Sequence, residues 1–186
     1  MPGTEDALDF DAIASNPMDF YLVATDAETG KPVYFNPDSF NPYLHEASCN
    51  LPILNQPIVY EGKEYYDGGV SDPIPWRKAF ELGAEKIIVV LTRPESIPRD
   101  PKRDEKLSHI LEKRYPNTAK ALRDRAFTYN NEVEDMKPYR NEGKILVLSP
   151  DNTCGVTTTK HRKEDIEALY RKGMKDAERI RAFLEC

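Results

Sequence analysis

The feature that most constrains the fold is the segment from Lys86 to Thr92 (KIIVVLT), in which every residue between the two ends is apolar. Strands buried on both faces read as unbroken runs of Val, Ile and Leu, whereas strands with one solvated face alternate. The segment therefore predicts a strand of a largely parallel sheet with helices on both faces. A second run, Lys144 to Leu148 (KILVL), predicts another buried strand.

Shorter elements are predicted before these strands. Turn residues at 26–30 indicate a hairpin over 20–35, and Glu61-Gly62-Lys63 indicates a second over 57–66. A short helix is expected within 41–50, and Gly83 is expected to end a helix over 74–82.

The segment 95–143 is charged and is predicted to be helical, with Pro116 separating two helices. The second helix carries a core stripe formed by Leu122, Ala126, Tyr129, Val133 and Met136. A last helix is expected to pack one face on the sheet, formed by Ile166, Leu169, Tyr170, Gly173, Ala177, Ile180 and Leu184. This order of strands and helices predicts one α/β domain, or part of one, over residues 1–186 with a mostly parallel sheet.

Composition narrows the class of protein. Charged residues make up 31% of the chain, and the longest strongly apolar run is too short to span a bilayer. The residues after Met1 are acidic and polar rather than a secretory signal, which favours the cytoplasm. A net charge of -6 argues against a nucleic-acid partner. Cys49, Cys154 and Cys186 are far apart, which predicts reduced thiols rather than a zinc site or disulfides.

The motifs of several common enzyme classes are missing. There is no Gly-x-Gly, no phosphate-binding loop and no pair of histidines at metal-ligand spacing, so neither a cofactor nor a metal is expected. No serine lies in Gly-x-Ser-x-Gly. The remaining candidate is Asp67-Gly68-Gly69, which on spacing alone also fits an ordinary tight turn after a strand.

Several segments together resemble the patatin-like phospholipase family, in its bacterial, cytoplasmic branch. They are Phe20 to Phe35 (FYLVATDAETGKPVYF), Ala47 to Pro52 (ASCNLP), Tyr66 to Pro75 (YDGGVSDPIP), Ala79 to Arg93 (AFELGAEKIIVVLTR), Ser149 to Val156 (SPDNTCGV) and Leu169 to Ala177. The resemblance implies the C-terminal half of a patatin-like three-layer fold with a mostly parallel central sheet, the N-terminal part missing.

The resemblance also implies a chemistry, lipid or small-ester hydrolysis by a serine and an aspartate without a histidine between them. Asp67 matches the catalytic aspartate, and Gly68 and Gly69 match the glycines that support it. A carboxylate within hydrogen-bond reach can take the proton that keeps a hydroxyl a poor nucleophile. The nucleophilic serine and the oxyanion loop should lie before residue 1, so this chain alone is expected to be inactive and to expose a sheet edge that invites association.

Other interpretations stay open. The chain could be a non-catalytic binding or interaction module derived from the same fold, and its oligomeric state is open. Asp67 and Asp72 could hold Mg²⁺ or Ca²⁺, although they lack the spacing of a calcium-binding loop. Arg93 is expected to pair with a carboxylate, and Trp76 to be a core aromatic or to line an acyl pocket. The helices of 95–143 could form a lid, an interface or a solvated face.

Overall fold

The computed structural model describes residues 9–36, 41–52, 54–157 and 162–185. Cys186, one of the three cysteines expected to be reduced, lies outside these ranges. The chain is of mixed α/β type and divides into two compact units, one formed by Met1–Pro73 and Asp100–Thr128, the other by Ile74–Arg99 and Tyr129–Cys186. Each unit has its own hydrophobic core and is described separately.

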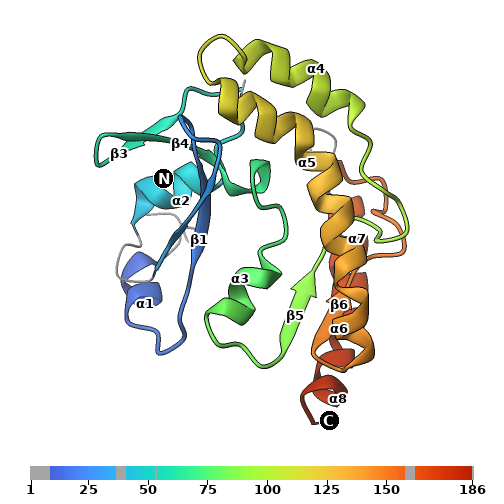
Figure 1. Cartoon of the computed structure of the whole chain (residues 1–186). Coiled ribbons are helices and arrows are strands. Elements are labelled where there is room, and N and C mark those ends of the chain that lie inside the picture. Colours follow the sequence, from blue (N-terminus) through green and yellow to red (C-terminus); the bar gives the residue numbers. More distant parts are fainter. Residues whose placement is uncertain (1–8, 37–40, 53, 158–161, 186) are drawn as a thin grey trace. The chain divides into compact units, whose positions relative to one another are not determined.

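The first unit contains a four-stranded antiparallel sheet in the order β2-β1-β4-β3 (Figure 1). Its strands are β1 (Leu22–Asp26), β2 (Pro32–Phe35), β3 (Ile58–Tyr60) and β4 (Lys63–Asp67). Both predicted hairpins are confirmed. At the first turn the Asp26 carboxylate accepts the backbone N–H of Thr29 (2.8 Å). At the second, Glu61 and Gly62 both have positive φ (48° and 76°), the conformation of a two-residue hairpin turn.

Helices cover both faces of this sheet. Tyr65 packs with Ala24 and Ala47 on the face that carries α2 (Pro42–Ser48), a helix whose N-terminus is capped by the side chain of Asn41. Tyr66, one residue further along β4, points to the other face. On that face its ring packs edge-to-face against Tyr115. Tyr115 lies in the connection between α4 (Lys102–Leu111) and α5 (Pro116–Asp135), which form a helical hairpin. A short helix, α1 (Phe10–Ala14), precedes β1.

The second unit contains a two-stranded parallel sheet formed by β5 (Ile87–Val90) and β6 (Ile145–Leu148). The helices α3 (Trp76–Glu81) and α6 (Lys137–Asn141) and the end of α5 pack on one face of it. The buried residues of this core are Ile74, Trp76, Val89, Leu91, Tyr129, Val133, Met136, Ile145 and Val147. The predicted stripe of α5 is confirmed, because all five of its residues are buried.

The expectation of a mostly parallel sheet is corrected. Parallel pairing is confined to β5 and β6, whereas the larger sheet is antiparallel throughout. Loop length is the physical reason for two of the three pairs, because the short turns that join β1 to β2 and β3 to β4 can connect only antiparallel strands. β5 is also not buried on both faces, since the Val90 side chain is 71% exposed.

The C-terminal segment forms two helices, α7 (Lys163–Ala177) and α8 (Arg179–Glu185), in place of the one expected. No residue in either helix is fully buried. Leu169, Ala177 and Ile180 are half-buried, whereas Ile166, Tyr170 and Leu184 are exposed. The predicted packing face is therefore only partly correct. Among the described residues, no helix has the length and apolar character needed to cross a bilayer.

Candidate functional site

The Asp67 turn lies at the end of β4, one of the two central strands of the antiparallel sheet. Asp67 is opposite Ala24 in the register with β1, and its backbone N–H donates to the carbonyl of Asn50 (2.9 Å). The Thr25 hydroxyl donates to the Asp67 carbonyl (2.8 Å). The backbone of this residue is therefore held on both sides by neighbouring elements.

The Asp67 carboxylate caps the short 3-10 helix that follows, η2 (Gly68–Val70). Its Oδ1 accepts the backbone N–H of Gly69 (2.8 Å), the usual geometry by which an aspartate closes the start of a helical turn. This bond fixes the direction of a half-buried carboxylate. The ordinary-turn interpretation of Asp-Gly-Gly is thereby satisfied, and any chemistry at Asp67 is an additional role.

Gly68 is required by a close approach. A Cβ at this position would lie 2.3 Å from the backbone oxygen of Val23, well inside van der Waals contact. Gly69 is less constrained, because its added Cβ would meet only Oδ1 of Asp67, at 3.2 Å. The two glycines therefore differ, and the first is the one that packs the turn against β1.

Several polar side chains near the turn are hydrogen-bonded to one another. Thr25 directs its single hydroxyl proton to the Asp67 carbonyl, so Ser71 Oγ is the donor of the 2.8 Å bond between Ser71 and Thr25. The Asp72 carboxylate accepts a short hydrogen bond from Tyr34. In the part of the chain that the structure describes, no three His, Cys, Asp or Glu side chains are grouped to hold a metal ion.

An open hollow of about 410 Å³ lies in the first unit, lined by residues of α2 and of the segment that leads to β3. Its lining includes His45, Cys49, Asn50 and Gln56. Asn50 connects the hollow to the turn, because its side chain donates to the Gln56 carbonyl (2.8 Å) and its own carbonyl accepts the N–H of Asp67. Asn50 is therefore the residue that links the lining of the hollow to the backbone of the turn.

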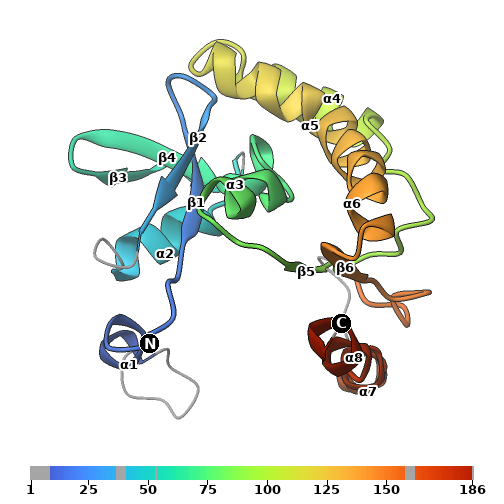
Figure 2. The same ribbon diagram turned by 60° about the horizontal axis from the view of Figure 1, so that its bottom comes forward.

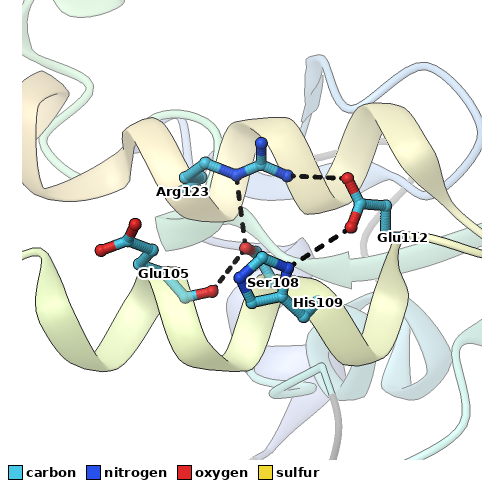
Figure 3. Close-up of polar contacts among 5 residues, drawn as sticks. All are labelled: Glu105, Ser108, His109, Glu112 and Arg123. Carbon is cyan, nitrogen blue, oxygen red and sulfur yellow. Dashed lines mark hydrogen bonds and ion pairs between the residues drawn. The ribbon is translucent and has the colours of Figure 1, made fainter.

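A serine, a histidine and a glutamate also lie together on the α4–α5 hairpin, a grouping not foreseen from the sequence (Figure 3). Ser108 Oγ donates to the Glu105 carbonyl (2.7 Å) and accepts from Arg123 (3.4 Å). His109 contacts Glu112 instead of Ser108, at 3.4 Å.

This grouping does not form a catalytic relay, because no hydrogen bond between the serine and the histidine is present among these contacts. Ser108 is fully buried, whereas 65% of the His109 side chain is exposed. The hydrogen bond from His109, followed by the charge of Arg123, lowers the pKa of Glu112. The cluster therefore ties α4 to α5.

Arg93 and Trp76 were the other residues singled out from the sequence. Arg93 does not pair with a carboxylate in the contacts described; its Nη2 donates to the carbonyls of Ile97 (3.2 Å) and Pro98 (3.3 Å), and its guanidinium lies over the Tyr129 ring.

Trp76 is a core aromatic, 4% exposed and packed edge-on against Tyr139. Its expected alternative role in an acyl pocket stays a prediction.

Tyr115 provides a pH-dependent contribution to stability in the first unit. Its hydroxyl donates to Glu64 Oε2 (3.0 Å), and burial, followed by this hydrogen bond, raises its pKa from 10.0 to about 12. The folded chain therefore keeps a proton that the unfolded chain releases, so this contribution is complete below pH 10 and is lost as the pH rises toward about 12.

We expect Tyr115→Phe to lower the free energy of unfolding by about 1.5 kcal/mol at pH 8, because it removes a hydrogen bond to a charged group. The difference between the variant and the wild type should shrink by pH 11. Urea unfolding of both proteins at a series of pH values measures this. A difference that stays constant up to pH 12 would contradict the assignment.

Two comparisons place the chain among known proteins. Residues 115–185 match the family model described as "Domain of unknown function (DUF6363)", which covers less than half of the chain and excludes Asp67. The chain is also similar to the "Uncharacterized protein YjjU" of Escherichia coli (strain K12), with 35% identity over 81 residues. That match covers 42% of this chain and 22% of the relative, so the chain corresponds to a small share of that protein's length.

These matches correct the family expected from the sequence. The matched family is a domain of unknown function and the matched relative is uncharacterised, and neither indicates a patatin-like phospholipase or an activity in lipid degradation. The segments quoted above for that resemblance are short. What the Asp67 turn can do must therefore be argued from its own geometry.

Proposed function

We propose that Asp67 is the general base of an acyl-transfer site whose nucleophilic hydroxyl comes from polypeptide outside these 186 residues. The single observation that carries the proposal is the orientation of the Asp67 carboxylate, which the Gly69 N–H holds at the end of a central strand. A base that accepts the proton of a hydroxyl must be positioned before the reaction, and such positioning is costly on a mobile loop.

The surroundings of the turn support this role. The Asp67 backbone is held by Asn50 and Thr25, and Asn50 leads to an open hollow large enough for the acyl or alcohol part of a small ester. Ser71 is a poor nucleophile, because its hydroxyl proton is directed to Thr25. The proposed substrate class is an ester of a lipid or a small alcohol, and the chain by itself should be inactive.

The test uses Asp67→Asn in a longer polypeptide that also carries the hydroxyl-bearing segment. An asparagine keeps an oxygen for the Gly69 N–H, so the turn should persist while the base is lost. Turnover of p-nitrophenyl butyrate should fall by about 10²–10⁴-fold, the usual contribution of a general base. The matched control is Asp72→Asn, whose carboxylate accepts from Tyr34 and takes no part in the proposed step.

Two results would oppose the proposal. One is a longer polypeptide that keeps full turnover with Asn at position 67. The other is ester turnover by the 186-residue chain alone that disappears with Asp67→Asn, because the nucleophile would then lie within the chain.

A second candidate is a non-catalytic interaction module. The observation that favours it is the exposed apolar stripe on α7, where Ile166, Tyr170 and Met174 recur every four residues and are 47%, 66% and 57% exposed. In this case Asp67 has only its capping role. Asp67→Asn would then leave binding of a partner unchanged, whereas Tyr170→Ser would weaken it.

A further inference from the structure

The open edge of β5 is a surface that the proposed function does not use. β5 and β6 form a parallel pair in the second unit, with Ile87, Val89 and Leu91 facing the core. Because side chains alternate along a strand, Ile88 and Val90 point to the opposite face. In the register of the pair, Val90 is opposite Leu148.

These two register partners differ sharply in exposure. Leu148 on β6 is 6% exposed, whereas Val90 on β5 is 71% exposed. Figure 2 shows β6 between α6 and α7, and the core on the α6 side contains no α7 residue, so α7 covers the face that carries Leu148. α7 therefore covers Leu148 on β6 but does not cover Val90, the register partner of Leu148 on β5.

The backbone of β5 is open along the same edge. The N–H groups of Ile87 and Leu91 donate to Lys144 (2.9 Å) and Leu148 (2.8 Å), so the odd-numbered residues face β6. In a parallel pair the alternate residues turn their N–H and C=O groups the other way. Ile88 and Val90 therefore present two donors and two acceptors to an edge that pairs with no strand in the described part of the chain.

β5 also lacks the features that protect edge strands. Such strands usually carry a proline or an inward-facing charge, and β2, an edge strand of the first unit, begins at Pro32. The four residues of β5 (IIVV) contain neither. An apolar edge of this kind is a ready template for pairing with an extended chain.

We propose that the open edge of β5 is an interface between two copies of this chain, paired antiparallel about a two-fold axis. Symmetry places Ile88 of one copy opposite Val90 of the other, with Val89 at the axis. Both opposed pairs then consist of edge-facing residues, so each pair exchanges two backbone hydrogen bonds. The exposed methyl groups of Val90 are covered by Ile88 of the other copy.

A second copy fits this edge better than another partner, because the same four residues supply every donor, acceptor and apolar side chain that the pairing needs. The interface is small. Four residues a side bury far less than the roughly 800 Å² per partner of a stable complex, so the dimer should be weak and concentration-dependent. It involves only the second unit and is independent of the role of Asp67.

The experiment is analytical ultracentrifugation of the 186-residue chain from about 10 μM to 1 mM, the range of a weak complex. The weight-average mass of the wild type should rise toward twice that of the monomer. Val90→Lys should weaken association at least tenfold, since it places two ammonium groups at the interface. The matched control is Val59→Lys, because Val59 is 62% exposed and lies on β3, an edge strand of the first unit. The Val59→Lys variant should associate like the wild type.

Amide hydrogen exchange gives a second readout that does not depend on a variant. Exchange at Ile88 and Val90 should slow with rising concentration, whereas exchange at Val59 should not change. A chain that stays monomeric over the whole concentration range would overturn the proposal. That result is expected if the edge of β5 pairs with a strand of another protein instead. Association that Val59→Lys abolishes and Val90→Lys leaves intact would also overturn the proposal.

Discussion

Gly68→Ala should lower the free energy of unfolding by about 3 kcal/mol, the upper end of the cost of overpacking. The added methyl group would lie 2.3 Å from the Val23 oxygen and 2.5 Å from the Val23 carbonyl carbon. Both are backbone atoms of β1, so no side-chain rotation can relieve the clash. The urea unfolding midpoint of the variant should fall accordingly, with an unchanged dependence on denaturant.

The matched control is Gly173→Ala. A Cβ at Gly173 would meet nothing within 4 Å, and the residue lies inside α7. Alanine favours a helix over glycine, so this variant should be more stable by about 0.5–1 kcal/mol. If both variants unfolded at the wild-type midpoint, the close approach of Gly68 to Val23 would be wrong.

This result separates two explanations of the Asp-Gly-Gly turn. A large effect of Gly68→Ala on stability shows that the glycine packs the turn, whatever the chemistry of Asp67. The effect of Asp67→Asn on turnover concerns only the base. A chain that needs Gly68 to fold and tolerates Asp67→Asn in every assay would be left with the ordinary-turn interpretation.

The local elements could be predicted because their signals are local. The hairpins follow from short turns with Gly30 and Gly62, which have φ of +66° and +76°. The stripe of α5 follows from the helical period, and Pro116 begins that helix. The Asp67 turn was identified on the same grounds, because Asp-Gly after a strand is a strong turn signal.

The pairing of the strands could not be predicted in the same way. β1 pairs with β4, some forty residues later, and no local pattern reports such a contact. The apolar run of β5 was therefore assigned to a covered parallel sheet, although its last residue is exposed. The break at Glu178 between α7 and α8 has no proline or glycine to mark it.

The second large effect on stability is expected for a buried ion pair between α4 and α5. The sequence alone does not distinguish this pair from the many other charged residues of these helices. Asp104 is 1% exposed, and its carboxylate receives two hydrogen bonds from Arg125, one at 2.9 Å from Nε and a shorter one from Nη2. This two-pronged geometry is the strongest form of arginine–carboxylate pairing. It joins the two helices inside the first unit.

Asp104→Ala should lower the free energy of unfolding by about 3–5 kcal/mol, because it leaves the Arg125 guanidinium, which is only 13% exposed, without its carboxylate. The matched control is Asp124→Ala, which removes an exposed pair with Lys120 on α5 and should cost less than about 0.5 kcal/mol.

The double variant Asp104→Leu/Arg125→Met distinguishes the cost of a stranded charge from the value of the pair. Replacing a buried pair by apolar residues is often neutral, so the double variant should recover most of the stability that Asp104→Ala loses. Urea unfolding of the wild type and the three variants completes the comparison. A double variant as unstable as Asp104→Ala would show instead that the hydrogen bonds of Asp104, rather than an unpaired Arg125, hold α4 to α5.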